Sequence, residues 1–129
     1  MAGGESFTPR ERAEVERAVR VAGSLSGLTF STYIGRSDGD PRRFAEQLHA
    51  GVPDAAYAVL VFVDPAGRQL EIVTGSEARR VLPDADCRLV VLAMQSAFAD
   101  GDLVGGLVTG LQQLGEHARR PRTAHIDEA

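Results

Sequence analysis

The sequence predicts one α/β domain in which helices and strands follow the order α-β-α-β-β-α-α around a mixed β-sheet. Three stretches lead to this fold class. An alternating segment at 28–34 precedes a helical pattern, a nearly continuous apolar run fills 57–63, and a glycine turn then leads into a second alternating segment at 68–73. A strand, helix and strand in succession imply parallel neighbours, whereas strands joined by a tight turn form an antiparallel hairpin.

The first helix is predicted to start at Thr8, after a flexible tail at residues 1–7. Thr8 and Glu11 have the spacing of a capping box, and Pro9 suits the first helical position. Apolar residues then recur at helical spacing, which places one face toward a core. This face comprises Val15, Ala18, Val19 and Ala22.

The first strand and the second helix follow. The strand at 28–34 is rich in β-branched and aromatic residues, and its alternation places four side chains on one face: Leu28, Phe30, Thr32 and Ile34. Asp40 and Pro41 then open a helix that Gly51 and Pro53 end.

The apolar run at 57–63 has the pattern of a central strand that is covered on both faces. The turn at 64–67 follows, with Gly67 expected to adopt a positive φ. In the segment 68–73 the alternation points Leu70 and Ile72 toward the core.

Helical patterns fill the rest of the domain, which is predicted to span residues 8–118. A short helical turn is expected at 77–81, and a helix starting at 82–84 carries one stripe of residues: Leu89, Leu92, Ala93 and Ser96. The last helix begins at Asp102 and has a broad apolar stripe: Leu103, Val104, Leu107, Val108, Leu111 and Leu114. Gly106 and Gly110 predict close packing against the sheet or the preceding helix, and a homodimer through this face is the alternative. The polar segment 119–129 is expected to be a disordered tail.

Composition narrows the classes of function. The net charge of -4 does not favour binding to nucleic acid. The chain has no apolar leader and no apolar run of about 18 residues, so we expect a cytoplasmic protein without a membrane span. The absence of lysine excludes Schiff-base chemistry, and a lone Cys87 excludes an internal disulfide.

Acidic residues follow the predicted strand ends and open the last helix. Ligands of open α/β sheets bind outside the carboxyl ends of the strands, and carboxylates suit Ca²⁺ or Mg²⁺. The candidate metal ligands are Asp38, Asp40, Asp64, Asp100 and Asp102. The alternative is structural, with Asp40 and Asp102 as helix caps and Asp38 and Asp64 as turn residues. Since EF-hand spacing is absent, a calcium site would have to be assembled from separate loops.

No residue is assigned as catalytic. The three histidines are isolated from one another and form no zinc pair: His49, His117 and His125. Cys87 lies near a helix start without a neighbouring base, so an inert thiol is favoured over a nucleophile. Asp84 with Asp86, and Asp100 with Asp102, have the spacing of aspartate phosphatases, but neither pair follows a strand.

Four stretches resemble the TPM domain, and more closely a related actinobacterial family of unknown function. They are 25–31 (LSGLTFS), 58–68 (AVLVFVDPAGR), 71–75 (EIVTG) and 98–107 (FADGDLVGGL), within a likeness that covers residues 8–118. The resemblance implies a Rossmann-like α/β sandwich with helices on both faces. It also implies weak acid phosphatase activity for some members, divalent metal binding for others, and roles in assembly or repair.

Two functions are therefore predicted from the sequence. The first is a non-catalytic interaction or accessory module that needs no cofactor and binds a protein partner, as a monomer or weak homodimer. The alternative is a weak, divalent-metal-dependent acid phosphatase that uses the loop carboxylates.

Overall fold

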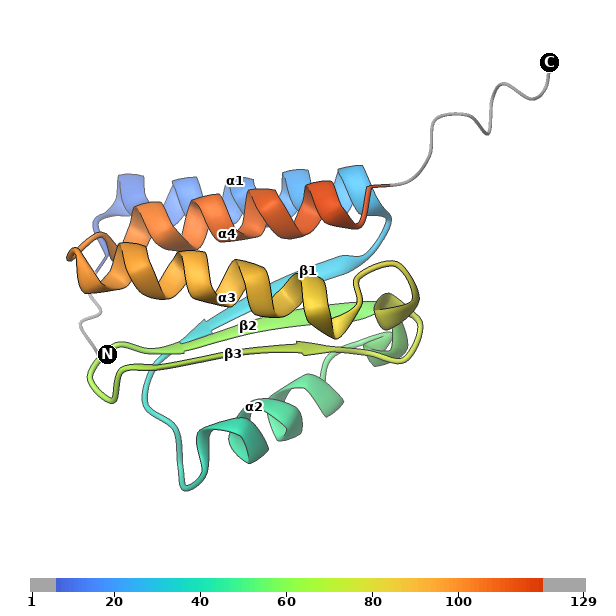
Figure 1. Ribbon diagram of the computed structural model, residues 1–129, viewed down its shortest axis with the longest axis horizontal. Helices are drawn as coiled ribbons and strands as arrows, with labels where there is room; N and C mark the ends of the chain where they lie inside the picture. Colours follow the sequence, from blue (N-terminus) through green and yellow to red (C-terminus); the bar gives the residue numbers. More distant parts are fainter. Residues whose placement is uncertain (1–6, 120–129) are drawn as a thin grey trace, which may run out of the picture.

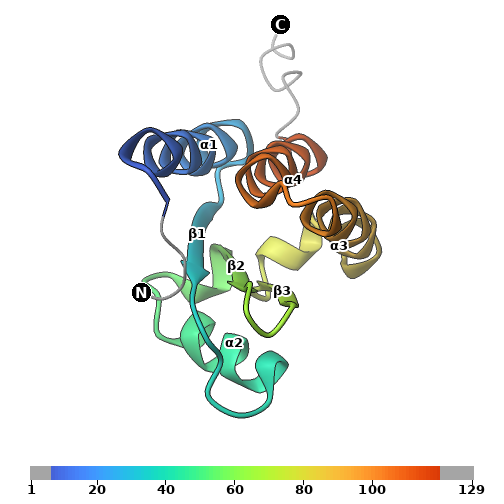
Figure 2. The same ribbon diagram turned by 90° about the vertical axis from the view of Figure 1, so that its left-hand side faces the viewer.

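A computed structural model describes residues 7–119, which form helical layers on both faces of a three-stranded sheet (Figure 1). Helices α1, α3 and α4 cover one face, and α2 covers the other (Figure 2). This arrangement confirms the predicted α/β class, the mixed sheet and the element order. The two predicted tails, 1–7 and 119–129, lie outside the described residues except at Phe7 and Arg119.

The sheet has the strand order β1-β2-β3. Strand β1 (Thr29–Ile34) is parallel to β2 (Ala58–Asp64), which is antiparallel to β3 (Gln69–Thr74). The register sets Ile34 beside Val63 and Asp64 beside Gln69. The ends of β1 and β2 therefore meet the start of β3 at one edge, which we call the carboxyl edge of the sheet.

Three of the helices begin at the predicted caps, and those of α1 and α2 come first along the chain. In α1 (Pro9–Ser26) the side chain of Thr8 accepts from the backbone N–H of Glu11 at 3.0 Å, and Glu11 accepts from the N–H of Thr8 at 2.9 Å, so the capping box is confirmed. In α2 (Pro41–Ala50) the carboxylate of Asp40 accepts from the N–H of Arg43 at 2.9 Å. The short 3-10 helices Ala55–Tyr57 and Ala78–Arg80 flank the hairpin, and the second confirms the helical turn predicted at 77–81.

The core has two parts because neighbouring side chains of β2 point to opposite faces of the sheet. Val59, Val61 and Val63 face the layer of α1, α3 and α4, together with the predicted Leu70 and Ile72 of β3. On the α2 side, Leu60 and Phe62 join a smaller cluster that also contains Ala45 and Val73. Every residue of β2 is buried, which confirms the prediction of a central strand covered on both faces.

Helix α4 (Leu103–His117) packs closely on its neighbours through glycines. A Cβ atom on Gly106 would lie 2.8 Å from the Cβ of Ala97, and one on Gly110 would overlap Met94, both in α3. A Cβ on Gly115 would lie 2.9 Å from the Cα of Ala22 in α1. The prediction of tight packing against the preceding helix is confirmed. Because the small-residue face is filled from within the chain, a homodimer would need another surface.

The sequence left open which side of α3 (Asp84–Ala99) faces the core. The predicted stripe of Leu89, Leu92, Ala93 and Ser96 does lie on one side of the helix, but that side faces outward. Leu89 is 61% exposed and Leu92 is 63% exposed, whereas Cys87, Val90 and Met94 are buried. The helix carries apolar residues on both sides, so periodicity alone does not select the buried one.

The β2–β3 turn also corrects a prediction. Gly67 is not among the residues with positive φ, and Arg68 takes the left-handed conformation instead, with φ of 56°. Glycine is favoured at position 67 for a different reason, since a Cβ there would lie 2.7 Å from Oδ2 of Asp64.

The orientation of α3 can be tested by truncating one side chain on each side of the helix. We expect Met94→Ala to lower the free energy of unfolding by about 2–5 kcal/mol, because it leaves a cavity in the core. Leu92→Ala should change the free energy by less than about 0.5 kcal/mol, because the side chain is exposed. Urea unfolding of both variants measures the difference. A larger loss for Leu92→Ala would contradict the observed orientation.

Candidate functional site

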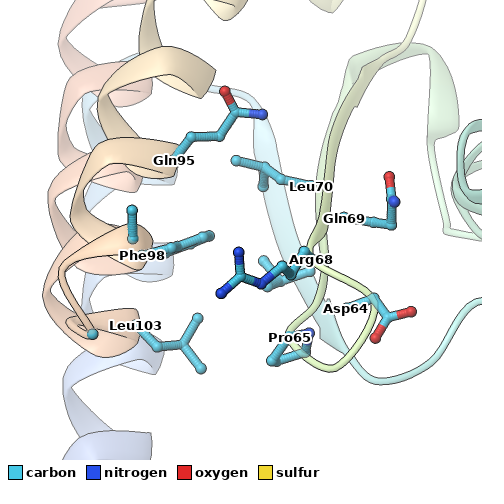
Figure 3. A pocket seen from close by; sticks show the side chains of 11 residues that line it. Asp64, Pro65, Arg68, Gln69, Leu70, Gln95, Phe98 and Leu103 are labelled. Carbon is cyan, nitrogen blue, oxygen red and sulfur yellow. The ribbon is translucent and has the colours of Figure 1, made fainter.

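A cavity of about 410 Å³ lies at the carboxyl edge, between the β2–β3 turn and the α3–α4 loop (Figure 3). Its walls are mainly apolar, with a few polar side chains, which is the usual character of small-molecule sites. The apolar lining comprises Val63, Pro65, Leu70, Phe98, Ala99 and Leu103. The polar lining comprises Asp64, Arg68, Gln69 and Gln95. We call this space the carboxyl-edge cavity.

Asp64 lies in the wall of the cavity but points its carboxylate away from the centre (Figure 3). Oδ1 accepts from the N–H of Gly67 at 2.9 Å, and Oδ2 accepts from the N–H of Ser37 at 3.3 Å. The side chain is buried, and it joins the β2–β3 turn to the loop between β1 and α2. The turn-forming role predicted for Asp64 is confirmed.

The other predicted ligands are distributed along the same edge. Asp40 caps α2, and Asp102 caps α4 by accepting from the N–H of Gly105 at 2.9 Å. Asp38 is exposed in the loop before α2, and Asp100 follows the last residue of α3. Across residues 7–119, no three His, Cys, Asp or Glu side chains are grouped so as to hold a metal ion. The capping interpretation is confirmed for two of the acids, and metal binding stays a prediction.

The sequence did not point to Arg68 and Gln95, two polar side chains that extend toward the cavity. Arg68 extends its guanidinium toward Phe98 and Leu103, and Gln95 of α3 reaches toward the cavity from above (Figure 3). A left-handed conformation costs a residue such as arginine about 1–2 kcal/mol. The local sequence carries no signal for this placement of Arg68, because the turn geometry depends on the hydrogen bonds of Asp64.

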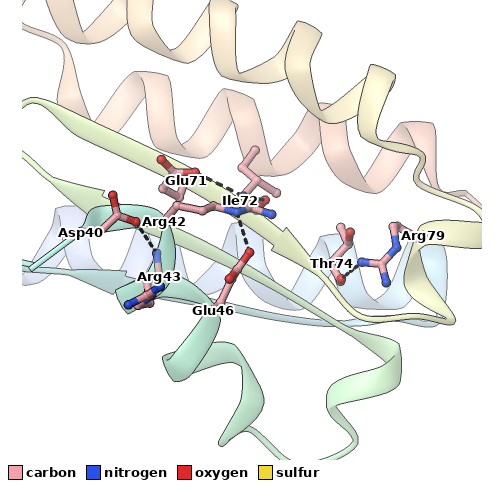
Figure 4. A network of polar contacts seen from close by, with 8 residues as sticks. All are labelled: Asp40, Arg42, Arg43, Glu46, Glu71, Ile72, Thr74 and Arg79. Atoms are coloured by element: carbon pink, nitrogen blue, oxygen red, sulfur yellow. Dashed lines mark hydrogen bonds and ion pairs between the residues drawn. The ribbon is translucent and has the colours of Figure 1, made fainter.

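A groove of about 470 Å³ runs between the edge strand β3 and α3. Beside it, Nη1 of Arg42 donates to the carbonyl of Ile72 at 2.9 Å and to Glu71 at 3.2 Å, while Nε donates to Glu46 at 3.0 Å (Figure 4). Arg79 donates to the carbonyl of Thr74 farther along the strand (Figure 4). Edge strands are templates for pairing with other chains, and here two outward carbonyls are already hydrogen-bonded.

A second groove runs along α4, and a set of exposed residues lies between the two grooves. We call this set the α3 ridge. Leu92 borders the groove beside β3, and Leu89 borders the groove beside α4, which is also lined by Gln112 and His117. The α3 ridge consists of Arg88, Leu89, Leu92, Ala93 and Ser96, all of them exposed.

The surroundings of Cys87, His49 and His117 favour structural roles for these side chains. Burial raises the pKa of Cys87 to about 11, with smaller contributions in the same direction from Asp84 and Asp86. Nε2 of His49 is 3.0 Å from the carbonyl oxygen of Ala58, and Nδ1 of His117 is 3.5 Å from the carboxylate of Asp86. The prediction of an inert thiol agrees with this raised pKa. His125 lies outside the described residues.

The thiol provides a direct test of this environment. A pKa near 11 leaves about 100-fold less thiolate at pH 8 than an unperturbed thiol with a pKa of 9.0. We therefore expect iodoacetamide to alkylate Cys87 at least about 100-fold more slowly in the folded protein than in urea. Mass spectrometry of timed samples measures both rates. Native and unfolded rates within a few-fold of each other would contradict the buried placement.

Residues 3–115 match the model of a family described as "Domain of unknown function (DUF5130)". The uncharacterised proteins MT2543 and Rv2468c, from two strains of Mycobacterium tuberculosis, are 34% identical to the chain over 108 residues. The match covers 84% of this chain and 65% of each relative, so the chain spans less than two thirds of their length. Separately, no helix within residues 7–119 is both long enough and apolar enough to cross a membrane.

Three solved structures share the fold at low sequence identity. The BA42 protein of Bizionia argentinensis has a TM-score of 0.76 at 20% identity, with 91% of this chain and 84% of that chain covered. The N-terminal domain of cg2496 from Corynebacterium glutamicum has a TM-score of 0.74 at 16% identity, covering 90% and 76%. The N-terminal domain of a protein from P. gingivalis has a TM-score of 0.71 at 18% identity, covering 86% and 75%.

Proposed function

This chain belongs to the DUF5130 family. For this member of the family we propose a non-catalytic interaction module that binds a protein partner through the α3 ridge. The observation that carries the proposal is the exposure of Leu89 and Leu92 on one side of α3, at 61% and 63%. Exposed apolar side chains that gather beside grooves are typical of protein interaction sites.

The two leucines are not required by the fold of the domain. The inner side of α3 is already occupied by Cys87, Val90 and Met94, which are buried against the sheet and the neighbouring helices. Burial of a leucine side chain on a partner contributes about 1.5–3 kcal/mol before the costs of association. Because folding does not bury the two leucines, their burial on a partner is free to contribute to the free energy of binding.

Charged and polar residues lie beside the leucines and supply a polar rim. Arg88 belongs to the ridge itself, Asp84 borders the groove beside β3, and Glu116 and His117 border the groove beside α4. Interfaces commonly combine an apolar centre with such a rim. We propose a partner that inserts apolar side chains on both sides of the ridge and directs polar groups to these residues.

The non-catalytic part of the proposal is supported by the engagement of the polar groups. Asp40, Asp64 and Asp102 accept hydrogen bonds from backbone N–H groups. The raised pKa of Cys87 keeps its thiol protonated at neutral pH, and a protonated thiol is a poor nucleophile. These residues thus have structural roles that account for their presence.

A double variant of the ridge tests the proposed interface. Leu89→Ser with Leu92→Ser should leave stability nearly unchanged, because both side chains are exposed. For a protein that co-purifies with the wild type, we expect the recovered amount to fall at least tenfold with this variant. A tenfold fall corresponds to a loss of about 1.4 kcal/mol in binding free energy. Quantitative mass spectrometry of affinity purifications measures the ratio.

Val21→Ser is the matched control, because Val21 is 42% exposed on α1 and lies outside the ridge. A partner that is lost with the ridge variant and kept with Val21→Ser supports the proposal. If every co-purifying protein is kept with the ridge variant while the purified chain turns over a phosphate ester, the interaction module is the wrong function.

The second candidate is a weak, divalent-metal-dependent acid phosphatase, and the observation in its favour is the position of Asp64 in the wall of the carboxyl-edge cavity. Asp38 and Asp100 belong to the adjoining loops. Because no three acids are grouped among residues 7–119, this function requires a loop to close on Asp64 around Ca²⁺ or Mg²⁺.

A titration with Ca²⁺ and Mg²⁺ after chelator treatment separates the two candidates. The interaction module predicts no saturable amide shift and no rise in melting temperature at millimolar metal. The phosphatase predicts saturable shifts around residues 38–40, 64 and 100–102. It also predicts metal-dependent hydrolysis of a phosphate ester that Asp102→Asn abolishes in a folded protein.

We also propose a kinship between this family and the TPM domain. The support is the stretches 58–68 and 98–107, which carry the resemblance in sequence. In the structure the first stretch comprises β2 and the β2–β3 turn, and the second contains the α3–α4 loop with the helix ends beside it. The turn and the loop border the carboxyl-edge cavity.

A further inference from the structure

We propose that the carboxyl-edge cavity binds a small aliphatic carboxylate. The head group pairs with the guanidinium of Arg68, and the apolar chain lies against Leu70, Phe98 and Leu103 (Figure 3). This binding site is separate from the α3 ridge and independent of the interaction proposed there.

Arg68 is the cationic group of the proposed site. Its backbone is held in the left-handed region, at φ of 56°, and its guanidinium extends into the cavity (Figure 3). The ion pairs found among the described residues engage Arg42, Arg80 and Arg119, and Arg68 takes part in none of them. A guanidinium offers two parallel N–H groups, which match the two oxygens of a carboxylate.

The walls of the cavity supply the apolar surface of the proposed site. Apolar side chains come from the end of β2, the start of β3, the last turn of α3 and the first residue of α4. The volume of about 410 Å³ lies within the range of about 300–1,000 Å³ that small-molecule sites occupy. A ligand that fills this space therefore needs an apolar body as well as an anionic head.

The neighbouring charges select a singly charged head group. Asp64 turns its carboxylate away from the cavity and binds the N–H groups of Gly67 and Ser37. Asp100 and Asp102 do not line the cavity, but they are the sequence neighbours of Gly101, which does, so the α3–α4 loop beside the cavity carries two acidic residues. A doubly charged phosphate monoester would be repelled more strongly than a monocarboxylate. Gln95 lines the same cavity and carries a side-chain amide that donates hydrogen bonds.

The position of the cavity agrees with this assignment. Open α/β sheets bind ligands outside the carboxyl ends of their parallel strands, and β1 and β2 both end at this edge. The groove between β3 and α3 also contains a second arginine, Arg88, besides the ion-paired Arg42, but this groove runs along the edge strand and not beyond the carboxyl ends of β1 and β2. The groove along α4 has no arginine in its lining.

The experiment is an amide chemical-shift titration with octanoate, octylamine and octanol, which share a chain and differ in head group. We expect octanoate to give saturable shifts confined to residues 63–70, 95–103 and their neighbours. Octylamine should give none, and octanol should bind at least about tenfold more weakly than octanoate, because it lacks the charge-assisted hydrogen bonds. Acetate and inorganic phosphate, tested alone, should give no saturable shift.

The variant Arg68→Gly removes the cation and suits the left-handed backbone conformation at position 68. Glycine adopts a positive φ without strain, so the melting temperature should stay the same or rise. Octanoate affinity should fall at least about tenfold. Arg17→Gln, on the exposed side of α1, is the control and should bind octanoate as the wild type does.

Three results would overturn the assignment. They are equal binding of octanoate by the folded Arg68→Gly variant, saturable binding of octylamine at the same residues, or octanoate shifts centred on the α3 ridge. The ridge variant with Leu89→Ser and Leu92→Ser should bind octanoate unchanged. Failure of the carboxylate site can therefore be recognised separately from failure of the interaction module.

Discussion

The close approach of α4 to α3 and α1 is the constraint on which the rest of this structure depends. Gly106 and Gly110 leave no room for a side chain between α4 and α3, and Gly115 does the same toward α1. The side chain of Met94 lies against Gly110, which fixes the rotation of α3 about its own axis. Leu89 and Leu92 are then directed outward, because they lie on the opposite side of the helix. The glycines of one helix thus create the apolar ridge on another, and the short loop between the two helices is brought to the carboxyl edge of the sheet.

Asp64 stabilises the loops at the carboxyl edge of the sheet. Its carboxylate accepts hydrogen bonds from Ser37 and Gly67, so it holds together the two loops that follow β1 and β2. The close contact excludes a side chain at position 67, and the reversal of the chain is completed by a left-handed Arg68. The guanidinium is consequently delivered into the cavity from the turn and not from a regular strand. Asp64 thus influences the cavity through the turn that it stabilises, because Arg68 enters the cavity from that turn.

The sequence predicts those features that depend on neighbouring residues. The capping box at Thr8, the cap at Asp102 and the parallel and antiparallel pairing of β2 all follow from local patterns, and the structure confirms them. The side of α3 that faces the core could not be predicted in this way, because Val90 with Met94 and Leu89 with Leu92 are equally apolar pairs. The buried side is the one that carries Met94, which packs against Gly110 of the following helix, and local periodicity does not reveal this contact. The placement of Arg68 also escaped prediction, because its left-handed conformation accompanies the close contact between Asp64 and Gly67, which the residue types alone do not reveal.

The edge strand limits how a partner can recognise this surface. Strand β3 is open on its outer side, and an open edge ordinarily invites another strand to pair with it. Here the carbonyl of Ile72 already accepts from Arg42, whose guanidinium is itself held by Glu46 and Glu71. The carbonyl of Thr74 accepts from Arg79. Pairing along this edge would break both hydrogen bonds and release Arg42 from its carboxylates, so strand addition is disfavoured. Recognition at the groove therefore depends on side chains, and the exposed leucines of the α3 ridge supply the apolar contacts that such a partner would bury.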